Sequence, residues 1–253
     1  MFEIRKKQVN ENCIIHIIDI KILSIDLKNY LDDHFVSICE GDSGSKLNAV
    51  KKIIIDFLET KDFRTKMGAT AEFFIHLYLK SIGFNQECLF LNLEERSIKK
   101  GFDGYYSINN EEYIMESKSG LSSTDSIKHE DKIKDAYDDL KNNLAGKSRK
   151  SKNNPWKNAY NHASHIDVGT TSSIRKNIKQ LSDEYEVSTY HDIKDFNIIP
   201  SSTIFLNNIW TDEYSNNIID TLESLSESLD FKKLNIICVT KQSLDLFKSY
   251  LEI

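Results

Sequence analysis

Apolar side chains recur along this chain with two different spacings, and the spacing predicts the type of each element. The clearest helix is predicted over residues 67–82, where apolar positions follow the i, i+4, i+7, i+8 pattern of one helix face. Gly83 comes directly after this pattern and is a typical helix stop. The predicted helices are residues 47–58, 67–82, 133–144 (closed by Gly146), 215–229 and 242–251.

Short runs rich in isoleucine, valine and aromatic residues predict the strands. The predicted strands are residues 14–27 (one or two strands), 88–93, 105–108, 112–118, 202–209 and 234–240. The third and fourth should form a hairpin, because Asn109 and Asn110 lie between them and asparagine tolerates the positive φ of a tight turn. Tyr105 and Tyr106 are expected to pack within this hairpin.

This mixture of strands and helices, with no internal repeat and no clear linker, predicts a mixed α/β fold. The simplest division has an N-terminal addition over residues 1–60 and a main domain over residues 61–253 that ends in a C-terminal extension. The two parts can equally form one continuous domain, since a chain of 253 residues accommodates one or two.

Composition narrows the class of protein. Hydrophobic residues make up 40% of the chain and charged residues 28%, which excludes wholesale disorder. No apolar run approaches the roughly 18–20 residues of a membrane span, and the charged N-terminus lacks the apolar stretch of a signal peptide. The four cysteines form no Cys-x-x-Cys pair, so neither a zinc ribbon nor a disulfide framework is expected. We therefore expect a reducing, cytoplasmic setting.

The charges are unevenly distributed. A net charge of −6 argues against a protein that coats nucleic acid over its whole surface, but residues 141–160 carry six basic side chains and no acidic one. The candidate DNA-binding residues in this segment are Lys147, Arg149, Lys150 and Lys152. Trp156 and Tyr160 could stack on bases beside them. A solvated loop explains the same charges equally well.

Four residues suggest catalytic chemistry: Glu72, Asp103, Glu116 and Lys118. Glu116 and Lys118 are two apart on a predicted strand and therefore share a face, and Asp103 enters the neighbouring strand of the hairpin. Glu72 lies at the border of the apolar face of its helix. Carboxylates gathered in this way bind Mg²⁺, for which Mn²⁺ can substitute, and the lysine can orient a water or stabilise developing charge. The predicted chemistry is metal-dependent hydrolysis of a phosphodiester, with Asp103, Glu116 and Glu72 as metal ligands.

The motifs Gly68-x-x-x-Glu72, Asp103-Gly104 and Glu116-Ser117-Lys118 resemble those of the PD-(D/E)xK, restriction-endonuclease-like nucleases. The resemblance spans residues 67–145 and implies an α/β fold with a restriction-endonuclease-like core (αβββαβ). Phe102 stands where the name-giving proline would be. More narrowly, the chain is similar to the nuclease-subunit family of the Hachiman anti-phage defence system (HamA). That similarity implies a Mg²⁺-dependent deoxyribonuclease that works with a HamB-like helicase partner.

Other patterns in the chain compete with this assignment. Acid-x-Lys triplets also begin at Asp19, Asp26, Glu59 and Glu130. The first two are on strand-like sequence, but they lack an Asp-Gly turn on a preceding strand and an upstream amphipathic helix with a bordering Glu. The segment 41–46 lacks the Walker spacing of a P-loop, and the pair His162 and His165 lacks a third metal ligand at a telling distance. Glu116 and Lys118 could also be a purely structural cross-strand pair. Two further functions therefore stay open: a catalytically inactive interaction subunit of nuclease fold, and a nucleic-acid-binding module.

Overall fold

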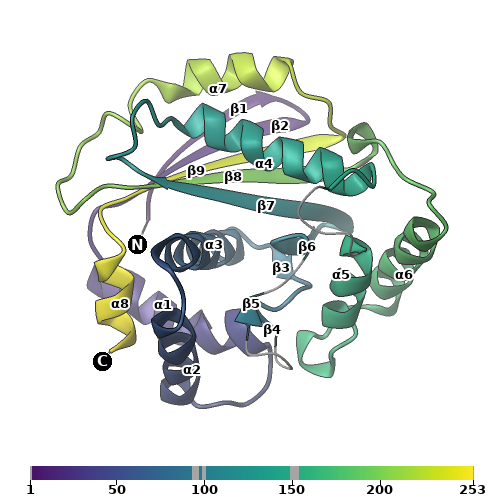
Figure 1. The fold of residues 1–253 in the computed structure, drawn as a ribbon, viewed down its shortest axis with the longest axis horizontal. Helices are drawn as coiled ribbons and strands as arrows, with labels where there is room; N and C mark the ends of the chain where they lie inside the picture. Colours follow the sequence, from purple (N-terminus) through teal and green to yellow (C-terminus); the bar gives the residue numbers. More distant parts are fainter. Residues whose placement is uncertain (1, 93–96, 99–100, 149–153, 253) are drawn as a thin grey trace.

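The computed structural model describes residues 2–92, 97–98, 101–148 and 154–252. A mixed seven-stranded sheet in the order β1-β2-β9-β8-β7-β6-β3 runs through the molecule (Figure 1). Its strands are β1 (Glu3–Asn10), β2 (Cys13–Ile20), β9 (Lys233–Lys241), β8 (Asn197–Phe205), β7 (Glu111–Leu121), β6 (Gly104–Ile108) and β3 (Asn85–Gln86). A separate antiparallel pair is formed by β4 (Leu91–Asn92) and β5 (Ser97–Ile98).

The four central strands β2, β9, β8 and β7 are parallel, and the outer strands β1, β6 and β3 pair antiparallel to their neighbours. All nine residues of β8 are buried, and β9 is buried along most of its length. Parallel strands covered on both faces are typically rich in apolar residues, as β2 is with its five isoleucines. Strand β8 departs from this pattern, because Ser201, Ser202 and Thr203 lie at its buried centre. The mixed α/β class predicted from the sequence is confirmed.

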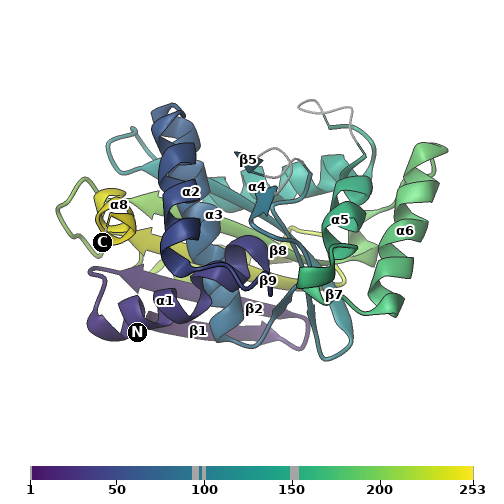
Figure 2. The ribbon, with the colours of Figure 1, turned by 90° about the horizontal axis from the view of Figure 1, so that it is seen from below.

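Helices cover both faces of the sheet (Figures 1 and 2). One layer contains α1 (Ile25–Glu40), α2 (Leu47–Glu59), α3 (Phe63–Ser81) and α8 (Asp245–Leu251). The other contains α4 (His129–Leu144) and α7 (Ile218–Glu227), whose apolar cluster continues into α5 (Pro155–Ala163) and α6 (Ser172–Glu186). The sheet thus separates two apolar clusters, and each side chain of a strand belongs to one face or the other.

Several elements differ from the sequence prediction. The strand predicted up to residue 27 ends at Ile20, because Ser24 caps α1 by accepting a hydrogen bond from the backbone N–H of Leu27 (3.3 Å). The predicted strand 88–93 is mostly irregular. Helix α6 was not predicted, although Ile174, Ile178, Leu181 and Tyr185 carry the helical spacing.

The structure describes all four cysteines and the helices between residues 2 and 252 that lie in its described ranges. All four cysteines are buried and none forms a disulfide. Within residues 2–92, 97–98, 101–148 and 154–252, no helix has both the length and the apolar character needed to cross a membrane.

Candidate functional site

The β6–β7 hairpin brings Asp103 beside Glu116. Asn109 and Asn110 both adopt positive φ (51° and 63°) at its tip, as their sequence predicted. The resulting register pairs Gly104 with Met115, so the preceding residue, Asp103, comes level with Glu116. The Asp103 carboxylate accepts a hydrogen bond from the backbone N–H of Ser117 at 2.8 Å, which fixes it against β7.

Gly104 is required by the packing behind Asp103. A Cβ atom at this position would lie 2.4 Å from Cε2 of Tyr106 and 3.0 Å from Cε of Met115. Tyr106 cannot easily give way, because it is fully buried and its hydroxyl is hydrogen-bonded to Nδ1 of His76. The Asp-Gly pair in the sequence therefore has a physical reason: the glycine admits a buried tyrosine on one face while the aspartate occupies the other.

Glu116 and Lys118 point from β7 toward α4, on the face opposite Tyr113 and Met115. The Lys118 ammonium contacts Oε1 of Glu116 and lies 2.8 Å from Oδ2 of Asp139 on α4. Glu116 is only 7% exposed, and its second oxygen, Oε2, is buried without a hydrogen-bond partner among the described residues. One lysine thus lies among three carboxylates, and one buried carboxylate oxygen is unsatisfied.

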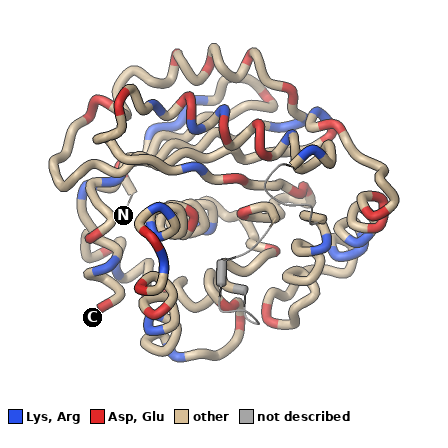
Figure 3. Tube along the Cα trace, viewed as in Figure 1, with Lys and Arg blue, Asp and Glu red and all other residues tan. Residues whose placement is uncertain are grey.

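The pKa values of Glu116 and Lys118 respond to burial and to the neighbouring charges. Burial, and next the charge of Asp103, raise the pKa of Glu116 from 4.5 to about 8, although Lys118 acts in the opposite direction. Burial alone would lower the pKa of Lys118, but the surrounding carboxylates raise it above its ordinary value. The charge of Asp103 contributes to both shifts, because it acts on the carboxylate of Glu116 and on the ammonium of Lys118. Acidic and basic residues are otherwise interspersed along α4 (Figure 3).

Glu72, the fourth predicted residue, is buried on α3, which covers the Tyr113 and Met115 face of the sheet, whereas Glu116 and Lys118 point to the α4 face. Burial raises the pKa of the Tyr106 hydroxyl, and the charges of Glu72 and Asp103 both add to this effect. The Glu72 carboxylate lies 3.3 Å from Nε2 of His76, which in turn bonds to Tyr106. The structure therefore brings together Asp103, Glu116 and Lys118 and adds Asp139, which the sequence analysis did not single out.

Two carboxylates of this group, those of Asp103 and Glu116, could hold a Mg²⁺ ion. No cluster of three His, Cys, Asp or Glu side chains in the described part of the chain is arranged to hold a metal ion. Mg²⁺ keeps several waters and is commonly held by one or two carboxylates, so Asp103 and Glu116 would suffice. The unsatisfied Oε2 atom of Glu116 offers a coordination position that no protein group uses in the described structure.

The basic segment differs in part from its predicted role. Lys147 is exposed, but Arg149, Lys150 and Lys152 lie outside the described residues. Trp156 is 1% exposed and packs against Phe102, with ring centroids 4.8 Å apart. The interpretation of Trp156 as a base-stacking residue is therefore wrong, because its ring is part of the core under Asp103. Tyr105 and Tyr106 are buried in the hairpin, as expected.

The competing acid-x-Lys triplets have structural explanations. Asp19 is paired with Arg5 (3.2 Å), and Lys21 with Glu3 (2.9 Å). Asp26 lies in the first turn of α1, which contradicts its assignment to strand-like sequence. Glu59 ends α2, and Glu130 lies in the first turn of α4, so neither is on a strand.

The two remaining motifs also lack the geometry of a functional site. Gly41 and Lys46 end α1 and precede α2, so their segment joins two helices and does not follow a strand as a P-loop does. His165 is an exposed residue whose Nδ1 atom lies 3.5 Å from a carboxylate oxygen of Asp167.

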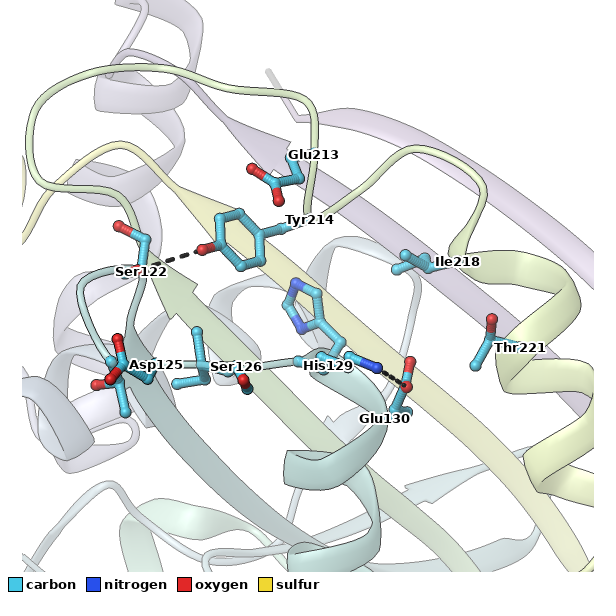
Figure 4. A pocket seen from close by; sticks show the side chains of 12 residues that line it. Ser122, Asp125, Ser126, His129, Glu130, Glu213, Tyr214, Ile218 and Thr221 are labelled. Atoms are coloured by element: carbon cyan, nitrogen blue, oxygen red, sulfur yellow. Dashed lines mark hydrogen bonds and ion pairs between the residues drawn. The ribbon is translucent and has the colours of Figure 1, made fainter.

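A cavity of about 500 Å³ lies away from this group, at the N-terminus of α4 (Figure 4). The hydroxyl of Tyr214 donates a hydrogen bond to the carbonyl of Ser122 across it (3.3 Å). His129 is buried between the hydroxyls of Ser202 (2.8 Å) and Thr240 (3.2 Å), and burial lowers its pKa to about 3. His129 is therefore a neutral, hydrogen-bonded core residue, and it offers no charge to a ligand.

The sequence matches no protein-family model, and no curated protein is significantly similar to it.

Proposed function

We propose that this chain is a Mg²⁺-dependent deoxyribonuclease that hydrolyses phosphodiester bonds. One observation carries the proposal: Asp103, Glu116, Lys118 and Asp139 are gathered at one place, and the most buried of the three carboxylates, Glu116, has an oxygen with no hydrogen-bond partner in the described structure. A buried carboxylate oxygen is unfavourable unless a proton or a cation satisfies it.

The order of elements supports the same proposal. Helix α3, strands β3, β6 and β7, helix α4 and strand β8 follow one another along the chain, with the short β4–β5 pair and the helices α5 and α6 as insertions. This order is compatible with the αβββαβ core that the resemblance to restriction-endonuclease-like enzymes implies. In that family pattern the acid of the Asp-Gly pair and the Glu-x-Lys triplet share one site, as Asp103, Glu116 and Lys118 do here.

The residues have separable chemical roles in this proposal. Asp103 and Glu116 would hold Mg²⁺, which when bound polarises the scissile phosphate and lowers the pKa of a coordinated water. Lys118 is placed to orient the attacking water or to stabilise charge that develops on the phosphate. The Ser117 N–H keeps the Asp103 carboxylate in place. Glu72 remains the proposed third metal ligand, a role that rests on the resemblance.

A cleavage assay with purified protein tests the proposal. Labelled duplex and single-stranded DNA are incubated with Mg²⁺, Mn²⁺ or EDTA, with Glu130→Gln as the control variant, since Glu130 belongs to a rejected triplet. We expect cleavage with either metal, none in EDTA, and full activity in the control. Salt-dependent DNA binding without any cleavage would instead favour a nucleic-acid-binding module, and neither binding nor cleavage would favour an inactive interaction subunit.

We also propose a role in anti-phage defence together with a helicase subunit, which rests on the resemblance alone. A nuclease with no sequence-reading motif endangers its own chromosome, so restraint by a partner is expected. The acidic residues after Leu181 (13 Asp and Glu against 5 Lys and Arg) suit a basic partner surface. Co-purification with a helicase encoded beside it, followed by cleavage assays with and without ATP, tests this. A complex that cuts intact duplex as fast as the free chain would contradict the restraint.

A further inference from the structure

Asp139 provides Lys118 with a second carboxylate from a different element. The Lys118 ammonium contacts Glu116 on its own strand and, at 2.8 Å, the Asp139 carboxylate on α4. The side chains of Lys118 and Asp139 are 20% and 26% exposed, so their contact is largely shielded from water. Residues from a strand and from the helix packed on it thus hold one ammonium between them.

A second anchor matters because lysine is long and flexible. An ammonium held by one contact keeps several positions open, whereas contacts on two sides define one position. Glu116 alone would hold the ammonium less firmly once Mg²⁺ is bound, because a metal at Oε2 repels an ammonium that contacts Oε1 of the same carboxylate. Asp139 remains available to Lys118 when Glu116 is engaged elsewhere.

We infer that Asp139 is a positioning residue, which holds the Lys118 ammonium at the reacting phosphate while Glu116 binds the metal. This inference rests on the proposed nuclease function and assigns Asp139 no direct contact with metal or DNA. The geometry agrees with this division, since the Asp139 carboxylate lies 2.8 Å from the Lys118 ammonium and reaches it from α4.

The test compares Asp139→Asn and Asp139→Glu with Asp138→Asn, which removes the same charge from an exposed neighbouring position of α4. Cleavage of a labelled duplex gives kcat and KM, and Mg²⁺-dependent thermal stabilisation reports metal binding without any turnover. Each Asp139 variant is also made in a Lys118→Met background. Misplacement of a catalytic group by about 1 Å typically lowers the rate about 100-fold.

We expect Asp139→Asn to lower kcat by about 10- to 100-fold, with the KM for DNA and the Mg²⁺ midpoint changed by less than about threefold. Asp139→Glu should recover most of the rate, and Asp138→Asn should behave as the wild type. In the Lys118→Met background the Asp139→Asn substitution should have no further effect, since groups that act as one unit are not additive.

Other outcomes would overturn the inference. Asp139 does not act through Lys118 if Asp139→Asn is as active as Asp138→Asn. The same conclusion follows if Asp139→Asn lowers the rate by the same factor in the Lys118→Met background as in the wild type. Loss of Mg²⁺-dependent stabilisation in Asp139→Asn would make Asp139 a metal ligand instead. A wild-type protein that neither binds Mg²⁺ nor cuts DNA would overturn the nuclease proposal as well, whereas an active wild type with an active Asp139→Asn variant contradicts only the positioning role.

Discussion

Replacing Glu116 by glutamine should stabilise the metal-free protein. The glutamine keeps the shape of the side chain and an oxygen for Lys118, but it removes a buried carboxyl group whose pKa is raised to about 8 by burial and by Asp103. A carboxyl group whose pKa is higher in the folded state than in the unfolded state destabilises the folded protein at any pH at which the unfolded carboxyl is ionised. The destabilisation therefore begins near the ordinary pKa of 4.5, grows as the pH rises, and is complete above about 8.

The size of this destabilisation follows from the difference between the pKa values of Glu116 in the unfolded and folded states. Between pH 4.5 and pH 7 the unfolded carboxyl is ionised while the folded one keeps its proton, and each pH unit contributes about 1.4 kcal/mol. The full penalty at pH 7 is thus about 3 kcal/mol, and we expect Glu116→Gln to recover about 1–3 kcal/mol of it. For a chain of this length that corresponds to a rise in Tm of about 3–10 °C.

Urea denaturation in EDTA at several pH values from 4 to 9 measures this directly. The stability advantage of Glu116→Gln should be near zero at pH 4 and should grow up to about pH 8. Glu111→Gln on the same strand is the control with the opposite sign, because a hydrogen bond from Lys233 lowers the pKa of Glu111. An advantage of the same size at pH 4 and pH 8 would refute the electrostatic reasoning, and so would its absence at pH 8.

Three further predictions concern other parts of the molecule. Lys241 is fully buried, and burial lowers its pKa to about 7. Lys241→Met should therefore raise the free energy of unfolding by about 2–4 kcal/mol at pH 6–7. Urea titrations should show that this gain becomes smaller toward pH 10. Gly104→Ala should lower stability by about 1–3 kcal/mol in thermal denaturation, whereas Gly68→Ala, whose added Cβ meets nothing within 4 Å, should raise it by about 0.5–1 kcal/mol. The last prediction concerns four basic residues, Lys147, Arg149, Lys150 and Lys152. When their charges are removed together, the slope of the logarithm of the DNA-binding constant against the logarithm of salt concentration should fall by about 0.9 for each lost contact with a phosphate of duplex DNA.

The parts of the site that are local in sequence could be predicted. The turn at Asn109 and Asn110 fixes the register of the hairpin, and the alternation of strand side chains places Glu116 and Lys118 on one face. Together these two rules bring Asp103 level with Glu116. The helical spacing of α3 likewise depends only on nearby residues, and the helix was predicted to within a few positions. The prediction of a single apolar face was wrong, because residues 69–79 are buried on all sides of the helix.

The parts that depend on how distant elements pack could not be predicted in the same way. Periodicity predicts that Glu72 borders an apolar face, but it does not show which face of the sheet α3 covers. Asp139 lies among the buried positions Ala136, Tyr137 and Leu140 of α4, the first helix after the Glu-x-Lys strand. This position would identify Asp139 as a site residue once α4 is known to pack across β7. The burial of Trp156 is also tertiary, because its partner Phe102 is distant in sequence.

The central claim, that Asp103, Glu116 and Lys118 form a metal-dependent nuclease site, is tested most directly by one comparison. Cleavage of labelled DNA in Mg²⁺ is measured for the wild type, Glu116→Ala and Asp19→Ala, each first shown to be folded by circular dichroism. The account predicts that Glu116→Ala loses cleavage while Asp19→Ala, from a rival triplet, retains it. A folded Glu116→Ala protein that cuts DNA at the wild-type rate would contradict the site assignment.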